Sequence, residues 1–217
     1  MLFLPMESTR VSRREIFERC IVNGLLIASV PMSSTKLFAL WQKTEQEATK
    51  PTPEEVLGPF YKKHAPNVKN LRGSGDQGVP LTVSGKVLNT RGEPVTGARV
   101  DIWQADHHGR YDVQGYRYRT KLALDEVSNY EIETVMPGHY SDRPAQHIHY
   151  LISAPGHKTL VTQVYFATDP YFEGDPDRKH AKGGIVGNRD LIRPVMLYEQ
   201  GTTPRTAVRF DLCLEKA

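Results

Sequence analysis

The sequence predicts an all-β fold, an antiparallel β-sandwich with long loops, on three observations. Apolar side chains recur at every second position, most clearly in Thr206–Leu214, where Val208, Phe210, Leu212 and Leu214 share one face. Short apolar runs are separated by turns that contain glycine or proline. No long segment has the 3.6-residue period of an amphipathic helix. Together these features are typical of a sandwich or barrel.

Each strand is expected where alternation or a run of β-branched residues is bounded by turn residues. In chain order, the expected strands are 81–88, 98–104, 130–135, 147–153, 160–166 and 206–214. The first two are joined by a turn at Arg91-Gly-Glu-Pro94. Loops 105–129 and 167–192 are long for connections without secondary structure, and such loops are often functional. Residues 81–217 should form the sandwich domain.

Composition sets several classes of protein aside. The chain has 217 residues, enough for one domain with an extension, and 39% of them are hydrophobic. Its 28 basic and 25 acidic residues leave a net charge of +3 without a basic stripe, so we expect no nucleic-acid partner. Cys20 and Cys213 form neither a disulfide framework nor a CxxC metal pattern. The chain is therefore expected to be globular without disulfide staples.

The first forty residues are typical of an export signal. Ser12-Arg13-Arg14-Glu15-Ile16-Phe17 precedes the apolar stretch Cys20–Val30, which is too short to cross the ~30 Å core of a bilayer. A paired arginine with an apolar residue at Phe17 resembles a twin-arginine signal. We expect residues 1–40 to engage export machinery and direct the protein to the periplasm. The alternative is a cytoplasmic protein with a packed N-terminal helix. Residues 41–80 should be a linker and a loop that leads into the domain.

His147 and His149 form the leading candidate for a metal site. On a strand, side chains two residues apart face the same way, about 6–7 Å apart, so two imidazoles can share one ion. Taken alone, the pattern is more typical of two unrelated histidines. Its neighbourhood adds weight, because a Pro137-Gly138 turn delivers Tyr140 just before it and a long loop ends at Tyr111.

Taken together and in this order, the motifs resemble those of the intradiol ring-cleavage dioxygenases. The resemblance runs from about residue 51 to residue 166, with weaker support to the C-terminus. The segments that carry it are Gly58-Pro-Phe-Tyr61, Gly92-x-Pro-x-x-Gly-Ala-x-Val-Asp-Ile-Trp-Gln-Ala-Asp106, Gly109-Arg-Tyr111, Pro137-Gly-x-Tyr140 and His147-Ile-His149. It implies a β-sandwich catalytic domain that holds a non-haem Fe(III) ion.

Carried over residue by residue, the resemblance implies four metal ligands: Tyr111, Tyr140, His147 and His149. Tyr140 would be the ligand that leaves when substrate binds, and Gln163 matches the family's glutamine beside the metal. Phenolate oxygen and imidazole nitrogen favour Fe(III) over metals that prefer soft ligands. The implied reaction is the O2-dependent opening of a catechol-type ring to a cis,cis-muconate-type diacid, with the iron remaining ferric.

Arg143 departs from the family pattern. The family places an arginine three residues before the first histidine, whereas Arg143 lies four before His147. On an extended strand, one residue reverses the face. We favour a bulge at Pro144–Gln146 that returns the guanidinium to the metal face. Otherwise Gln146 occupies its place and Arg143 is a surface residue.

The pocket and the alternatives complete the prediction. Tyr61 and Trp103 are candidates for lining the substrate pocket, although Trp103 also suits core packing. Two other functions stay open: a transthyretin-like binding module, and a zinc or copper hydrolase with His107 or His108 as a third ligand.

The chain looks like the iron-bearing kind of protocatechuate 3,4-type chain, because it has all four ligands and no helical N-terminal segment. Such chains form homo- or hetero-oligomers, and the particular catechol is left open.

The export hypothesis can be tested on the intact chain. Replacing the pair by Arg13→Lys and Arg14→Lys should strand the protein in the cytoplasm, because the paired arginines are the recognition element of the signal. Cell fractionation, with a cytoplasmic marker as control, measures the distribution. An equal distribution of wild type and variant would favour the packed-helix alternative.

Overall fold

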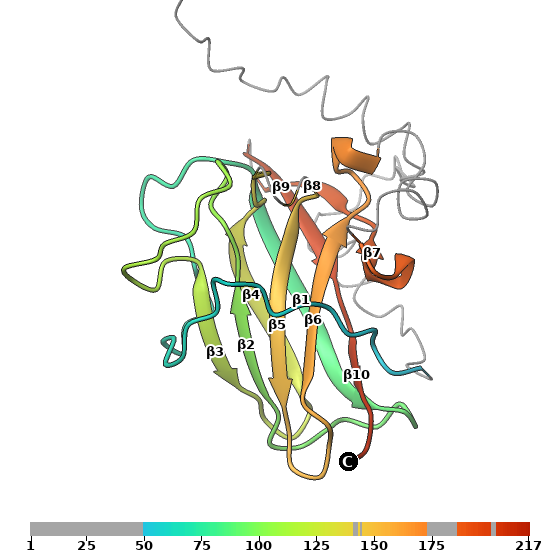
Figure 1. The fold of residues 1–217 in the computed structure, drawn as a ribbon. Coiled ribbons are helices and arrows are strands. Elements are labelled where there is room, and N and C mark those ends of the chain that lie inside the picture. Colours follow the sequence, from blue (N-terminus) through green and yellow to red (C-terminus); the bar gives the residue numbers. More distant parts are fainter. Residues whose placement is uncertain (1–49, 141–142, 144, 173–185, 201–202) are drawn as a thin grey trace, which may run out of the picture.

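Two five-stranded β-sheets pack face to face in the computed structural model, which describes residues 50–140, 143, 145–172, 186–200 and 203–217 (Figure 1). In one sheet the order is β10-β1-β9-β8, and β4 also pairs with β1; in the second it is β3-β2-β5-β6-β7. The elements are β1 (Pro80–Asn89), β2 (Arg99–Trp103), β3 (Arg119–Ala123), β4 (Asn129–Val135), β5 (His147–Ser153), β6 (Leu160–Phe166), the short 3-10 helices η1 (Pro170–Phe172) and η2 (Arg189–Leu191), β7 (Ile192–Arg193), β8 (Met196–Gln200), β9 (Thr203–Arg209) and β10 (Leu212–Leu214). The predicted β-sandwich is confirmed.

The predicted strands are present, with two differences. The expected strand 206–214 is interrupted at Phe210 and Asp211, where the Asp211 carboxylate accepts the Lys86 N–H (2.9 Å) in place of a backbone carbonyl. Strands β9 and β10 run parallel to β1, so this sheet is mixed and not purely antiparallel.

Three strands lie where no strand was expected. Strand β3 falls within the predicted loop 105–129, the two-residue strand β7 begins at the end of the predicted loop 167–192, and β8 lies beyond that loop. In β3 the adjacent residues Arg119 and Thr120 are both buried, which hides the alternation of apolar and polar residues that identifies a strand.

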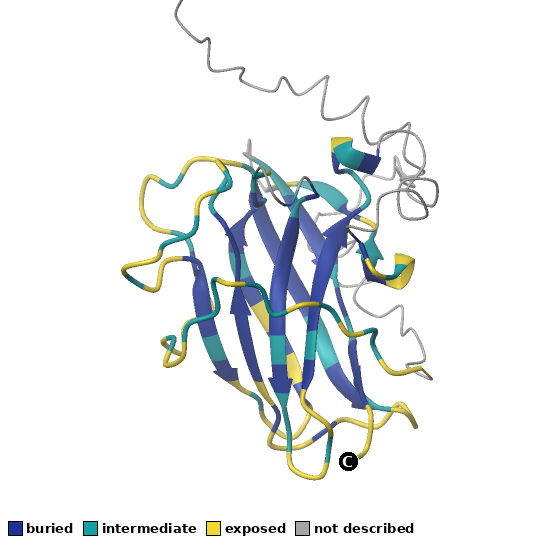
Figure 2. Ribbon diagram, in the orientation of Figure 1, coloured by how far each residue is buried: buried dark blue, intermediate teal, exposed yellow. Residues whose placement is uncertain are grey.

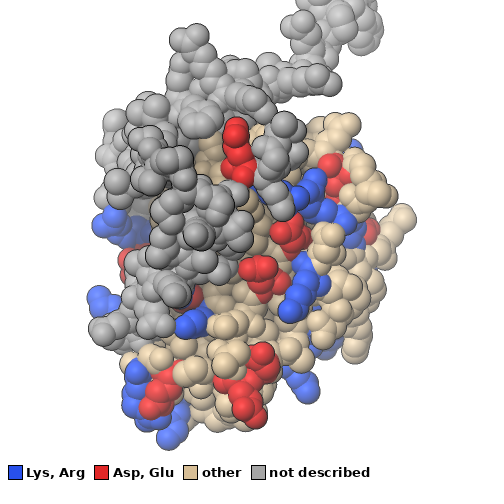
Figure 3. All heavy atoms as spheres, turned by 180° about the vertical axis from the view of Figure 1, so that it is seen from behind, with Lys and Arg blue, Asp and Glu red and all other residues tan. Residues whose placement is uncertain are grey.

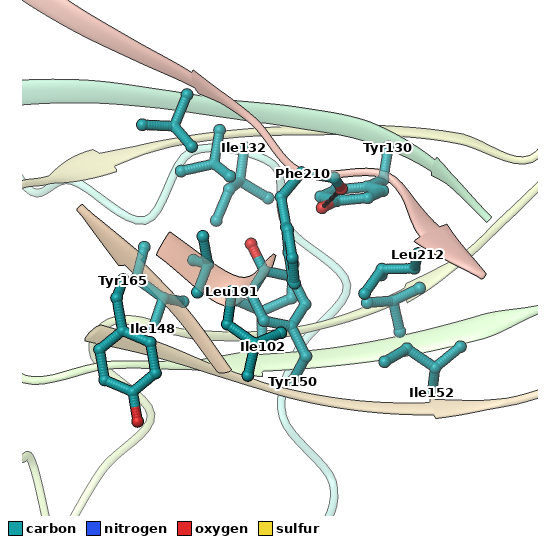
Figure 4. Close-up of a cluster of buried hydrophobic side chains, with 14 of the residues drawn as sticks. Ile102, Tyr130, Ile132, Ile148, Tyr150, Ile152, Tyr165, Leu191, Phe210 and Leu212 are labelled. Atoms are coloured by element: carbon teal, nitrogen blue, oxygen red, sulfur yellow. Dashed lines mark hydrogen bonds between the residues drawn. The ribbon is translucent and has the colours of Figure 1, made fainter. Parts of the chain in front are cut away.

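The core fills the space between the sheets (Figures 2 and 4). Tyr150 from β5 meets Tyr130 and Phe210 from the opposite sheet, with ring centroids 6.0 and 5.4 Å apart. The Tyr130 hydroxyl donates to the Phe210 carbonyl (2.5 Å), so its polar end is satisfied inside the core. Edge-to-face aromatic contacts of this kind stabilise the interface between the sheets.

Residues 50–72, which we term the strap, cross the outer face of the second sheet (Figure 1). This segment falls in the region expected to be a linker and a leading loop, yet its backbone is bound to both sheets. In chain order its backbone hydrogen bonds are Thr52 N–H to Cys213 C=O (3.0 Å), Glu55 N–H to Val161 C=O (2.9 Å), Lys121 N–H to Pro66 C=O (3.0 Å) and Leu71 N–H to Glu133 C=O (2.8 Å). The strap therefore covers the outer face of β5 and β6 and protects the edge strands β3 and β4.

The predicted signal at residues 1–40 lies outside the described residues, so its outcome stays a prediction. Within the described ranges, no helix has the length and apolar character needed to cross a bilayer. Acidic and basic side chains are intermingled over the described surface seen from behind (Figure 3).

Candidate metal centre and active site

Strand β5 has two buried faces with different chemistry. Ile148 and Tyr150 point into the core, so the alternation of side chains directs His147 and His149 to the opposite, outer face. Both histidines are nevertheless buried, with 3% and 1% of their surface exposed. Their ring centroids lie 4.8 Å apart. The predicted pair on one face is thus present, in a place from which bulk water is excluded.

The loop after β2 is shaped by Asp106, which holds the chain that leads to Tyr111. The Asp106 carboxylate accepts the N–H groups of His108 (2.8 Å) and Arg110 (2.9 Å), and it forms an ion pair with the Arg110 guanidinium (3.0 Å). The Asp106 N–H donates to the Arg110 carbonyl (2.9 Å). Aspartate side chains commonly order tight loops through such local hydrogen bonds, and here the loop delivers Tyr111.

The two loops that carry the tyrosines pack backbone to backbone. Gly138 N–H donates to the Asp106 carbonyl (2.8 Å). A Cβ atom at Gly109, whose φ is +79°, would lie only 1.9 Å from the His139 carbonyl oxygen. Only glycine allows so close an approach in this conformation. Gln104 adds a buried link, because its amide donates to the Val135 carbonyl (2.8 Å) at the end of β4.

As a result, the four side chains predicted to be metal ligands converge. The Tyr140 hydroxyl lies 3.3 Å from His147 Nε2. The Tyr111 ring centroid lies 5.7 Å from that of Tyr140 and 6.3 Å from that of His149. Two phenols and two imidazoles thus surround one point, although they come from three separate segments of the chain.

The protonation of these groups suits a hard metal cation. His147 Nδ1 lies 2.7 Å from the Ala145 carbonyl, which makes it the donor and leaves the Nε2 lone pair facing Tyr140. Burial lowers the pKa of His147 to about 4 and that of His149 well below 6.5, so both imidazoles are neutral. The Tyr111 hydroxyl is buried with no hydrogen-bond partner among the described groups. An orphaned oxygen in a set of two phenols and two imidazoles fits a ferric ion.

Burial also raises the pKa of Tyr111, and the neighbouring Tyr140 hydroxyl adds to this shift. A buried phenol loses its proton at neutral pH only to a strong positive charge, which a bound metal ion supplies. Among the described residues, no three His, Cys, Asp or Glu side chains are grouped to hold a metal ion. The alternative with His107 or His108 as a third ligand therefore lacks a structural basis.

Arg143 reaches the histidine-bearing face and meets β6. Its Nη2 donates to Gln163 Oε1 (2.6 Å) and to the Tyr165 hydroxyl (2.7 Å). Tyr165 also donates to Gln163 Oε1 (2.9 Å), which closes a three-membered cluster. Gln163 and Tyr165 pair across the sheet with the two histidines of β5. The Arg143 Nε–H is buried and has no partner among the described residues, so one donor stays unused.

Arg143 does not lie on an extended strand, so a shift of one residue does not reverse its face. Strand β5 begins at His147, and Arg143 instead bridges Tyr140, with its N–H donating to the Tyr140 carbonyl (3.0 Å). Pro144, in the predicted bulge, lies outside the described residues. The Gln146 amide donates to the Pro137 carbonyl (2.8 Å). The structure therefore brings Arg143 to Gln163 and directs Gln146 elsewhere.

The strap supplies the next layer of the site. Phe60 stacks on Tyr111, with ring centroids 4.2 Å apart and planes at 13°. Gly58, with φ +73°, lies so close to His149 that a Cβ atom would be 3.2 Å from its Cε1. A side chain at this position would push the imidazole and strain the backbone.

Trp103 and Tyr61, the predicted pocket residues, lie on the other side of His149. Trp103 is buried and stacks on His149 at 4.9 Å with the planes at 5°, and Tyr61 packs on Trp103 at 5.1 Å. Trp103 thus supports the ligand from behind. A pocket role for either residue stays a prediction.

Sequence reasoning missed several residues of this site. Phe60 belongs to the Gly58-Pro-Phe-Tyr61 motif, of which only Tyr61 was predicted to be a pocket residue. Tyr165 lies two residues after Gln163 on β6, so the two side chains face the same way, and this spacing would have identified Tyr165 as a residue of the site. Arg119 is buried below Tyr111 and donates to the Phe60 carbonyl (2.5 Å). No sequence pattern singles out a lone arginine of this kind.

The fold and the site define a class, a β-sandwich protein with a centre of two tyrosines and two histidines. Residues 56–216 match the family described as dioxygenase. The chain is 31% identical to a catechol 1,2-dioxygenase of Candida albicans over 179 residues, which cover 70% of the chain and 58% of that protein. It is 35% identical to a hydroxyquinol 1,2-dioxygenase of Rhizobium sp. over 149 residues, 55% of the chain and 49% of that protein.

A solved structure agrees with these relatives. The dioxygenase domain of a dioxygenase–carbohydrate-binding protein fusion from Streptomyces sp. SirexAA-E is 33% identical, with a TM-score of 0.65, over 77% of the chain and 100% of that domain. The chain belongs to the intradiol ring-cleavage dioxygenase family, whose members use non-haem iron. It spans about half to three-fifths of the length of the two curated relatives.

The buried histidines predict how the metal-free protein responds to acid. Between pH 6.5 and about 4, the unfolded chain binds a proton at His147 that the folded state does not. The free energy of unfolding should therefore fall with decreasing pH, by at most about 1.4 kcal/mol per pH unit for this group, and level off below its folded pKa. Urea denaturation of chelator-treated protein measures the slope. His147→Gln should reduce the slope, and an unchanged slope would contradict the assignment.

Proposed function

We propose that this chain is a non-haem Fe(III) intradiol dioxygenase that opens a catechol-type ring with O2 to give a cis,cis-muconate-type diacid. The observation that carries the proposal is the convergence of Tyr111, Tyr140, His147 and His149 in a buried site. Family membership supports the same reaction. When bound, the ferric ion would act as a Lewis acid that holds the catecholate and keeps the phenolates ionised.

Tyr140 is suited to exchange places with the substrate. It lies on a short loop that is partly exposed, whereas the two histidines are buried on a strand. As a ligand of the ion, Tyr140 would be a phenolate whose Oη could accept the proton of a catechol hydroxyl, and as a neutral phenol it would no longer be needed to hold the metal. Tyr111, held under the Phe60 ring, keeps its place. The two tyrosines thus have different tasks because their surroundings restrain them differently.

Arg143 stabilises the negative charge that develops on the ring during cleavage. Its free Nε–H is available to an anion, while its Nη2 is fixed by Gln163 and Tyr165. A fixed cation in a buried site requires little reorganisation when charge appears. Gln163 is itself anchored, because its Nε2 donates to the Val56 carbonyl of the strap (2.8 Å).

The substrate class follows from the relatives, which are named for catechol and hydroxyquinol. We propose a catechol-type substrate with these two as first choices; the sequence itself leaves the particular catechol open. Periplasmic action and oligomerisation stay proposals from the sequence.

Reconstitution with ferric ion tests the proposed function. The loaded protein should be reddish, because tyrosinate ligands donate charge to Fe(III) in the visible range, and it should consume O2 with at least one member of a catechol panel. Tyr111→Phe and Tyr140→Phe should shift or bleach the band, and His147→Ala should lose iron. A colourless protein without O2 uptake would favour a transthyretin-like binding module.

A second experiment separates Arg143 from Gln146. Arg143→Ala should lower turnover by about 10²–10³-fold while iron and colour are retained, since loss of one donor to a developing anion typically costs this much. Gln146→Ala, whose amide bonds to the Pro137 carbonyl, should have a much smaller effect. Steady-state O2 uptake at saturating substrate measures both variants. The reverse ranking would assign the role to Gln146.

A further inference from the structure

Asp169 is a buried carboxylate outside the ligand set, and it lies between the two ligand-bearing segments. It follows β6, with its N–H donating to the Phe166 carbonyl (2.9 Å) and its carbonyl accepting the Phe172 N–H (2.9 Å). Its side chain is fully buried. A charge in such a place is costly unless several donors satisfy it.

The donors that satisfy Asp169 come from both ligand segments. Oδ2 accepts the Gln146 N–H (2.5 Å), and Oδ1 lies 2.7 Å from His139 Nε2. Oδ1 also accepts the Tyr171 N–H (2.9 Å), which fixes the carboxylate in its own turn. Gln146 directly precedes His147, and His139 directly precedes Tyr140. One carboxylate therefore holds the residue before each of two predicted ligands.

We infer that Asp169 is a positioning residue of the metal site, which restrains the neighbours of Tyr140 and His147 through the His139 side chain and the Gln146 N–H. This inference rests on the proposed function. Hydrogen bonds to a carboxylate are short and strong, and in a buried site they restrain both partners. Arg143 bridges the Tyr140 backbone, so its own backbone is joined to the same segment.

The alternative to a positioning role is a purely structural one, and the chain offers a matched control. Asp211 is also largely enclosed, with 9% of its side chain exposed, and also accepts a backbone N–H, from Lys86 (2.9 Å). Its second oxygen accepts Arg209 Nε (3.0 Å). It lies between β9 and β10, away from the ligand-bearing segments. Asp169→Asn and Asp211→Asn thus make the same chemical change, one beside the ligands and one away from them.

The test compares iron affinity and the tyrosinate-to-iron absorption band of purified, ferric-loaded full-length proteins, with thermal unfolding measured in parallel. Asp169→Asn should weaken iron binding by about 10–100-fold, as loss of a group that orients a ligand typically does, and should shift or broaden the band. Asp211→Asn should leave affinity and band unchanged, even where it lowers the unfolding temperature. An affinity and band for Asp169→Asn equal to those of wild type would overturn the inference.

A second pair covers the case in which Asp169→Asn does not fold. His139→Gln retains a donor to Asp169 and should behave like wild type, whereas His139→Leu removes it and should alter the band. Equal bands in the two variants would overturn the inference. Absence of iron binding and colour in the wild type would instead overturn the proposed function, on which the inference rests, before any variant is compared.

Discussion

The burial of strand β5 on both faces is the constraint on which the rest of the structure depends. In a two-layer sandwich, one face of each sheet meets the core and the other meets water. Here Ile148, Tyr150 and Ile152 use the inner face, and His147 and His149 occupy the outer one. Because those histidines are buried, something other than a sheet must cover them. The strap and the loops after β2, β4 and β6 do so.

This arrangement explains why so many polar groups in the site are fixed by backbone atoms. Loops that cover a buried face must satisfy their own N–H and C=O groups there. Asp106 bonds to the backbone of its own loop. Gln104 and Gln163 bond to the backbone of segments that are distant in the sequence. The hydrogen bonds that make the cover stable are therefore also those that hold the side chains around the metal position.

The sandwich was predictable from local signals, because period-two alternation and turn residues predict strands at the positions of β5 and β6. The same alternation predicts the pair His147 and His149 on one face of a strand. The addition of Tyr111 and Tyr140 to that pair came from the resemblance to the family and not from their spacing in the chain. Strand β3 was missed because its polar residues Arg119 and Thr120 are buried by the strap, a segment more than fifty residues away in the sequence. The expected reversal of face at Arg143 assumed an extended strand there, but β5 begins four residues later, at His147.

The roles of other members of the site depend on contacts that local patterns do not show. Asp169 lies in a loop whose sequence resembles any other turn, and its importance comes from two segments that the fold brings to it. Phe60 and Gly58 act through a strap that reads as a linker, because its backbone is extended and its hydrogen bonds go to distant strands. Contacts between residues that are far apart in the sequence cannot be predicted from the pattern of adjacent residues.

The bond between Thr52 and Cys213 bears on the order in which the molecule is assembled. The two residues are 161 positions apart, and they join the start of the strap to the last strand of the sandwich. Closing so long a loop carries an entropic cost that is recovered only when both ends find their places. During synthesis, β5 and its histidines emerge well before β10. The anchor of the strap at Thr52 can therefore form only after the last strand of the sandwich has been synthesised.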